Sequence, residues 1–330
     1  MSAPRSADKS GERSSGARGR YRSTTLRAAT KSATVGSRST ARRYFAAKMR
    51  TWGEERDAAV ALLRAAGIAT AALDADVLLA HVLGVTKEML YAHPDTEMSL
   101  GAERRYRDLI ERRARGEPVA YLRGFKEFYG LRFTVDPRVL IPRPETETLV
   151  DAARELIAGR TVTVADVGTG SGAVAIAIAA HERSVHVIAT DISTDALVVA
   201  RENTLRNGVA DRIELREGDL LSPIAEPVDL VVANLPYLRD DTLEHLVGER
   251  TSLAFEPRLA VTAGKDGLEL IWRAASDLSR VLAPQGAALF EIDPPFAEQV
   301  AHLLQYSLGG KTRVINDLAG DARVVGITRR

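Results

Sequence analysis

The stretch Asp166-Val167-Gly168-Thr169-Gly170-Ser171-Gly172-Ala173 decides how this chain is expected to fold. A β-branched run over 161–167 leads into it, and an alanine-rich run over 173–180 follows directly. Glycines let the backbone turn sharply and approach a ligand without a Cβ in the way. A strand, a glycine-rich turn and a helix in this order predict the first unit of an α/β sheet with a ligand-binding loop, although such a turn also occurs without a ligand.

The same alternation continues to the C-terminus. Short β-branched runs alternate with longer amphipathic runs, which predicts a mostly parallel sheet with helices on both faces. Ligands bind such sheets at the carboxyl ends of the strands. The pattern predicts strands at 161–167, 185–190, 213–215, 228–233, 287–292, 312–315 and 323–328, and helices at 173–180, 196–207 and 268–282.

An acidic residue, Asp191, ends the second predicted strand, 23 residues after Gly168. A carboxylate in this place can accept hydrogen bonds from both hydroxyl groups of a ribose. The glycine-rich loop and this carboxylate together predict an adenosine-containing cofactor. Both NAD and S-adenosylmethionine satisfy that description.

The end of the fourth predicted strand carries the sequence Asn234-Leu235-Pro236-Tyr237. The side-chain oxygen of Asn234 and the carbonyl of Leu235 can each accept one N–H of a planar amino group, Tyr237 can stack on its π-system, and Pro236 stiffens the turn. Two acceptors help to localise the lone pair of an amide or exocyclic amine and aim it at an electrophilic methyl group. This chemistry needs neither a general base nor a metal ion, and it favours S-adenosylmethionine as the cofactor.

Composition sets limits on the remaining alternatives. The 330 residues include no cysteine, which excludes disulfides, thiolate zinc sites and cysteine nucleophiles, and the six histidines show no zinc-ligand spacing. No apolar run is long enough to cross a bilayer. The formal net charge is only +1, but residues 1–50 contribute +11 and the rest of the chain −10. The chain is therefore expected to be a basic tail on an acidic body.

The tail, residues 1–50, is rich in Ser, Thr, Arg, Ala and Gly and has no hydrophobic period, so we predict that it is disordered. Three interpretations stay open. It could be an organellar transit peptide, it could be a nucleic-acid-binding arm, or Met49 could be the true first residue, in which case 1–48 are not translated.

Residues 51–116 are predicted to form a small helical bundle. Apolar residues recur at helical spacing, and Gly67 and Gly84 fall where helix C-terminal glycines belong. The bundle could be a structural cap or a surface that recognises a macromolecule.

Several further motifs make the chain resemble the HemK family of protein-(glutamine-N5) methyltransferases, which act on peptide chain release factors. The resemblance runs from about residue 54 to residue 328 and is most specific in Arg143-Pro144-Glu145-Thr146-Glu147. The other matching stretches are 117–121, 124–129, 140–142, 255–260, 264–268 and 317–320 with Arg323.

The resemblance implies a seven-stranded Rossmann-like sheet of the class I methyltransferase type with a small N-terminal helical domain. It implies a release-factor recognition domain at 51–116, a linker hairpin at 117–145 and a catalytic domain at 146–330. It also implies roles for individual residues. S-adenosylmethionine would be held by Gly168, Thr169, Gly170, Ser171, Gly172, Asp191, Asp219, Leu220 and Asn234, and the substrate glutamine of a Gly-Gly-Gln loop by Asn234, Leu235, Pro236 and Tyr237, with Arg143 and Glu145 bracing the pocket.

Two features depart from the family pattern. Leu235 replaces the first proline of Asn-Pro-Pro-Tyr, as in the rRNA adenine dimethyltransferases, but leucine supplies the same backbone carbonyl. Asp293-Pro294-Pro295-Phe296 imitates an adenine-methyltransferase motif, yet it follows the fifth strand and is expected to be structural.

Two rival functions follow from these departures: a nucleic-acid adenine-N6 methyltransferase, and a catalytically weak binding protein of the same fold. The acidic body and the Arg-Pro-Glu-Thr-Glu stretch weigh against the first. We therefore expect a metal-free monomer that methylates release factors in the bacterial cytoplasm, or in an organelle if the tail is a transit peptide.

Overall fold

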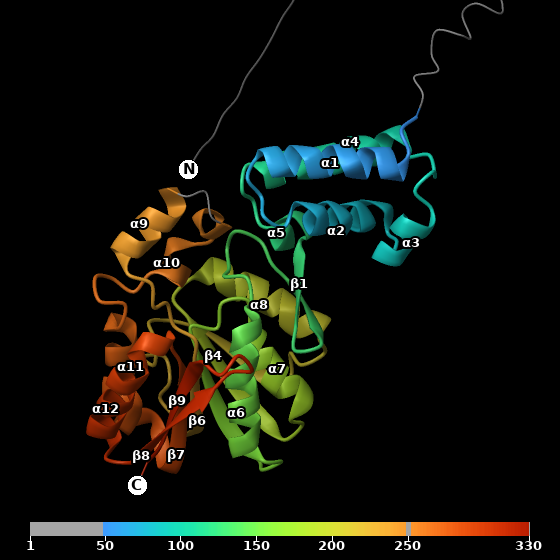
Figure 1. Ribbon diagram of the computed structural model, residues 1–330. Helices are drawn as coiled ribbons and strands as arrows, with labels where there is room; N and C mark the ends of the chain where they lie inside the picture. Colours follow the sequence, from blue (N-terminus) through green and yellow to red (C-terminus); the bar gives the residue numbers. More distant parts are fainter. Residues whose placement is uncertain (1–48, 249–251, 330) are drawn as a thin grey trace, which may run out of the picture. The chain divides into compact units, whose positions relative to one another are not determined.

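The computed structural model describes residues 49–248 and 252–329, and a twisted β-sheet forms the centre of its C-terminal part (Figure 1). The predictions for the tail, residues 1–48, lie outside the described residues. Across the sheet, the strands of the described chain are β5 (Ile213–Glu217), β4 (Val185–Asp191), β3 (Val162–Val167), β6 (Val228–Ala233), β7 (Leu282–Glu291), β9 (Ala322–Thr328) and β8 (Lys311–Asn316).

The order of these strands places a switch point at β3. Neighbouring strands from β5 to β7 are parallel, whereas β9 runs antiparallel to both β7 and β8. The chain leaves β3 toward β4 on one side and returns to β6 on the other. Loops after β3, β4 and β6 therefore meet at one edge of the sheet, where ligands of such folds bind. The predicted seven-stranded, mostly parallel sheet is confirmed for the described residues.

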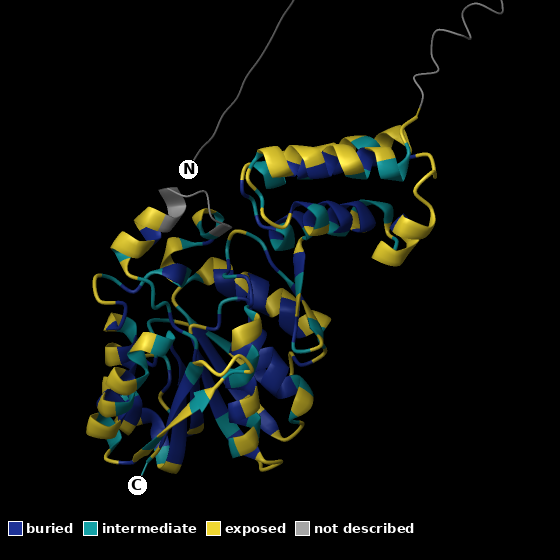
Figure 2. Ribbon diagram, viewed as in Figure 1, coloured by how far each residue is buried: buried dark blue, intermediate teal, exposed yellow. Residues whose placement is uncertain are grey.

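Helices cover both faces of this sheet because its central strands are apolar on both sides. Val164 of β3 packs into one cluster and its neighbour Ala165 into the other. The first face is covered by α6 (Glu147–Ile157), α7 (Ala173–His181) and α8 (Thr194–Arg206), and the second by α11 (Glu269–Val281) and α12 (Ala297–Leu308). Figure 2 shows the strands buried between these layers and the exposed residues on the outer sides of the helices.

The N-terminal helices have a hydrophobic core of their own. Leu63, Leu78 and Tyr106 are fully buried in it, and the Tyr106 hydroxyl donates to the carbonyl of Ala75 at 3.1 Å. A capping box at Thr51 begins the first helix. The helices are α1 (Trp52–Ala65), α2 (Ala71–Leu83), α3 (Lys87–Ala92) and α4 (Leu100–Ala114).

A short helix and a hairpin connect this bundle to α6. They are α5 (Val119–Arg123), β1 (Phe125–Phe128) and β2 (Leu131–Thr134), followed by the 3-10 turn η1 (Pro144–Thr146). Asn203 of α8 accepts from the backbone N–H of Thr134 at 2.7 Å and donates to its carbonyl at 3.0 Å, which fixes the end of the hairpin on α8.

An excursion between β6 and α11 returns to the same edge of the sheet. It contains α9 (Asp240–Gly248), η2 (Ser252–Phe255) and α10 (Arg258–Val261), and η3 (Pro294–Phe296) follows β7. Leu238 exchanges backbone hydrogen bonds with Val261 and Ala263, so the excursion closes back on the loop after β6. No helix in the described part of the chain is both long and apolar enough to cross a membrane.

Candidate active site

A cavity of about 340 Å³ lies at the carboxyl ends of β3, β4 and β6. Its size is within the range of small-molecule and cofactor sites. It brings together eight of the residues that the sequence predicted for the site. These are Gly168, Gly170, Asp191, Asp219, Leu220, Asn234, Leu235 and Pro236.

The glycine-rich loop has the backbone that only glycine adopts without strain. Gly168, Gly170 and Gly172 have φ angles of +72°, +56° and +81°. Thr169 and Ser171 are buried behind the cavity wall and do not line it. Thr169 donates its hydroxyl proton to Asp166 at 2.6 Å, and burial raises the pKa of Asp166 to about 6. Thr169, Ser171 and Gly172 therefore shape the loop from behind.

The carboxylate of Asp191 is held by backbone N–H groups at the cavity wall. Its Oδ2 accepts from Gly170 at 2.8 Å and its Oδ1 accepts from Ser193 at 2.9 Å. Burial raises the pKa of Asp191, and these backbone hydrogen bonds oppose that rise because they favour the charged form. The loop after β3 and the acidic residue after β4 thus fix one another.

Asp219 and Leu220 form the wall after β5. Leu220 has a left-handed φ of +50°, and its carbonyl accepts from the Thr190 hydroxyl at 2.9 Å. Asp219 forms an ion pair with Arg273 of α11, which also lines the cavity. Arg273 was not predicted, because nothing in the local sequence indicates which helix faces Asp219.

Asn234 follows β6 with its side chain fixed from outside the cavity. Its Nδ2 donates to Thr146 Oγ1 at 3.0 Å, so the opposite side of the amide, its Oδ1, remains as the acceptor. Leu235 is buried against the glycine-rich loop, and a Cβ on Gly168 would come within 3.0 Å of its Cδ2. The asparagine, the leucine carbonyl and the loop thereby share one wall.

Tyr237 borders this segment but does not line the cavity. Burial, together with the nearby charges of Glu291 and Asp293, raises the pKa of Tyr237 to about 12. The phenol is therefore neutral at neutral pH.

Arg143 and Glu145 lie outside the cavity lining as well. Arg143 donates to Oε1 of the buried Glu256 at 2.5 Å, and the backbone N–H of Ile141 donates to Oε2 at 3.1 Å. Glu145 is exposed. Arg143 thus supports the cavity indirectly, because Glu256 precedes Pro257 and Leu259, which line it.

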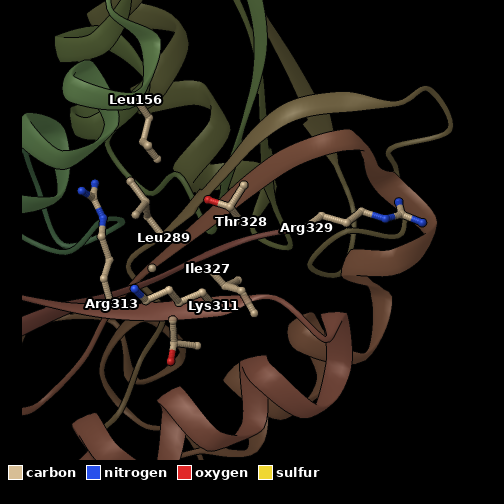
Figure 3. A pocket seen from close by; sticks show the side chains of 9 residues that line it. Leu156, Leu289, Lys311, Arg313, Ile327, Thr328 and Arg329 are labelled. Atoms are coloured by element: carbon tan, nitrogen blue, oxygen red, sulfur yellow. The ribbon is translucent and has the colours of Figure 1, made fainter.

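A second groove, of about 480 Å³, lies along β8 and β9, away from all of these residues. Figure 3 shows Leu156 and Leu289 close to the Arg313 side chain, with Lys311 and Ile327 lying apart from the two leucines. Thr328 pairs with Ala287, near the beginning of the parallel part of β7, so this groove lies toward the end of the sheet opposite to the cavity. None of the predicted site residues lines this second groove.

Comparison with known proteins identifies the family of this chain. The family described as PrmC N-terminal domain matches residues 55–124, and the family described as ribosomal protein L11 methyltransferase (PrmA) matches residues 144–249. A release factor glutamine methyltransferase from Koribacter versatilis is 39% identical over 274 residues, which cover 82% of this chain and 95% of the relative. One from Cereibacter sphaeroides is 39% identical over 268 residues, covering 81% and 95%.

This chain belongs to the release factor glutamine methyltransferase family. The family predicted from the Arg-Pro-Glu-Thr-Glu stretch and the Asn234 segment is confirmed. Among solved structures, the ribosomal protein L11 methylase from Lactobacillus delbrueckii subsp. bulgaricus is similar, with 25% identity, a TM-score of 0.43, and 59% of this chain and 84% of that chain covered.

Three supporting residues of this enzyme were not predicted from the sequence. Thr146 is uncharged, and only the tertiary fold brings it to Asn234. Glu256 becomes buried only in the tertiary fold. The third is Arg273, for the reason given above.

Proposed function

We propose that this enzyme transfers a methyl group from S-adenosylmethionine to the N5 side-chain amide nitrogen of the glutamine in the Gly-Gly-Gln motif of class 1 peptide chain release factors. The observation that carries the proposal is the Asn234 amide. Thr146 holds its nitrogen, which leaves Oδ1 as an acceptor at the cavity wall beside the glycine-rich loop.

The residues present fit S-adenosylmethionine. Gly168 and Gly170 offer a wall without side chains for its amino-acid part, Asp191 offers carboxylate oxygens for the ribose hydroxyls, and Leu220 beside Asp219 offers an apolar surface for the adenine. When bound, the cofactor supplies an electrophilic methyl group on a positively charged sulfur. Thr169, Ser171 and Gly172 contribute by holding the loop.

The substrate side of the cavity orients a poor nucleophile. Asn234 Oδ1 and the Leu235 carbonyl accept the two N–H groups of the glutamine amide, and Pro236 limits the freedom of the turn. Tyr237 adjoins this segment as a neutral ring outside the cavity lining. The amide nitrogen would take the methyl group that the bound cofactor supplies, and it would release one proton to solvent, because that proton becomes acidic as the nitrogen takes the methyl. Positioning therefore replaces a general base or a metal ion.

The N-terminal bundle, residues 51–116, is the part that we propose to recognise the release factor, with 117–145 as the linker to the catalytic residues 146–330. The match of residues 55–124 to a domain named for this family supports that division. We propose that the enzyme acts as a monomer. A release factor acts at the ribosome, and we propose the bacterial cytoplasm as the place of reaction.

The test is a methyl-transfer assay with labelled S-adenosylmethionine on a purified release factor and, separately, on rRNA. We expect label on one glutamine of the release factor. Asn234→Ala should lower the rate about 100- to 1000-fold, because it removes an acceptor that acts on the reacting group. Asn207→Ala, outside the cavity, is the matched control and should keep the rate. Label on RNA alone would show an adenine methyltransferase, and label on neither would show a binding protein.

A further inference from the structure

Glu291 is a buried carboxylate beside the proposed amide-binding segment, and the reaction described above does not use it. It is the last residue of β7, and its predecessor Phe290 pairs with Ala233, so Glu291 lies at the level of Asn234 on the neighbouring strand. Its exposed fraction is 2%, and its Oε2 has no hydrogen-bond partner. A buried, unpaired oxygen is costly, and its presence in a folded protein calls for an explanation.

Thr146 connects Glu291 to Asn234. The Thr146 hydroxyl lowers the pKa of Glu291 through a side-chain hydrogen bond, although burial is the larger effect and raises it. The same oxygen accepts from Asn234 Nδ2 at 3.0 Å. A hydroxyl has a single proton to donate. When that proton points to an ionised Glu291, only lone pairs of Thr146 face Asn234, and the amide must turn its NH₂ group toward them.

The surroundings of Glu291 act on its pKa in both directions. Burial and the nearby Glu145 favour its neutral form, whereas Thr146, Arg323 and Arg143 favour its ionised form. Together these effects raise the pKa of Glu291 to about 7. On the remaining side Tyr237 faces this carboxylate, and it stays neutral.

We propose that Glu291 is a positioning residue for methyl transfer, which in its ionised form fixes the Asn234 amide through Thr146 with Oδ1 directed at the substrate. This inference rests on the proposed function of Asn234. Protonated Glu291 can donate to Thr146 instead, which frees the Thr146 proton for Asn234 Oδ1 and allows the amide to turn over. The amide then presents N–H groups to the substrate amide and cannot accept from it.

The inference sets the direction of a pH effect. The active form is the ionised one, so kcat is full above the pKa of Glu291 and falls as the pH drops through it, near pH 7. Binding of S-adenosylmethionine should not change over the same pH range, because the proposed cofactor-binding residues Gly168 and Asp191 belong to other loops than Asn234.

The experiment compares Thr146→Val, Thr146→Ser and Glu291→Gln with the wild type on purified release factor. It measures kcat and KM on both sides of neutral pH, and cofactor binding by calorimetry. We expect Thr146→Val and Glu291→Gln to lose about 10- to 100-fold in kcat, and their acid-side decline to disappear, because a misaligned acceptor acts at every pH. Thr146→Ser keeps the hydroxyl and should keep both the rate and the decline.

The outcomes separate this inference from the proposed function. A wild-type enzyme that leaves the release factor unlabelled overturns the proposed function. An active wild type overturns the positioning role if Thr146→Val keeps the full kcat or if Glu291→Gln keeps the acid-side decline. If Glu291→Gln no longer binds the cofactor, the comparison of Thr146→Val with Thr146→Ser decides alone, because a loss in the valine variant without one in the serine variant requires the hydroxyl.

Discussion

The two halves of the cavity are built by different means. On the cofactor side, Asp191 is held by the backbone N–H groups of Gly170 and Ser193. Gly170 lies in the loop directly after β3, and Ser193 follows two residues after Asp191. On the substrate side, Asn234 is held by the side chain of Thr146, 88 residues earlier in the chain. A carboxylate held by backbone N–H donors has one hydrogen-bonding arrangement once the loop has formed. Side chains that bind one another in series, such as Thr146 and Asn234, can reverse the direction of their hydrogen bonds.

The two buried carboxylates show this difference most clearly. Burial raises the pKa of both Asp191 and Glu291, but backbone N–H groups counter the rise at Asp191. Glu291 has no such donors and its pKa is raised to about 7. The cofactor half thus contains a carboxylate whose charged form is stabilised by backbone donors, and the substrate half contains one whose pKa is about 7.

The largest effect on cofactor binding is expected from breaking the backbone-held half. Asp191→Ala leaves the N–H groups of Gly170 and Ser193 without their acceptor, which costs about 1–3 kcal/mol each when water does not replace it. We expect binding of S-adenosylmethionine to weaken by at least about 100-fold, measured by calorimetry. Asp195→Ala, an exposed acidic residue of α8, is the control and should bind normally. Equal binding by both variants would mean that the loop holds the cofactor without Asp191.

The same difference explains what could be predicted from the sequence. The glycine-rich loop and Asp191 were predicted correctly as parts of one cavity wall, because strand, turn and helix follow one another directly in the chain. Most of the seven strands were located for the same reason, since they are short β-branched runs, whereas β7 is an apolar run without β-branched residues. The pattern did not show α6 or α12.

The substrate half was predicted less completely. Asn234, Leu235 and Pro236 line the cavity as expected, yet their support could not be seen in the sequence. In the Arg-Pro-Glu-Thr-Glu stretch the charges suggested that Arg143 and Glu145 act at the pocket. Instead Arg143 pairs with Glu256, 113 residues later, and uncharged Thr146 contacts Asn234. Such pairings depend on how distant segments pack, and no local pattern records them.

A smaller effect is expected from the support behind the cavity wall. Arg143→Ala leaves the buried carboxylate of Glu256 with only the N–H of Ile141 as a donor, so we expect a loss of about 2 kcal/mol in the free energy of unfolding. This loss is smaller than for a fully buried ion pair, because water reaches the guanidinium group of Arg143. Denaturant unfolding measures it. Arg138→Ala, whose ion pair with Asp136 is exposed to solvent, should lose less than 1 kcal/mol. Similar losses in both variants would show that Glu256 is satisfied without Arg143.

The smallest effect is expected at the residue that departs most visibly from the family pattern. Leu235→Pro keeps the backbone carbonyl that accepts from the substrate amide, and it loses only part of the packing against Gly168. The loss of one methyl contact destabilises the folded protein by about 1 kcal/mol. Proline also restricts the unfolded chain, which stabilises the folded protein by about 0.4–1 kcal/mol. We therefore expect kcat within about threefold of the wild type, with little change in stability. Leu235→Ala also keeps the backbone carbonyl, but it removes most of the leucine side chain and does not stiffen the unfolded chain. We expect it to lose about 2–4 kcal/mol in the free energy of unfolding, with a nearly unchanged kcat. A large fall in kcat for the proline variant alone would show that the turn at this position must stay adjustable, and that the substrate half depends on backbone freedom as well as on its side chains.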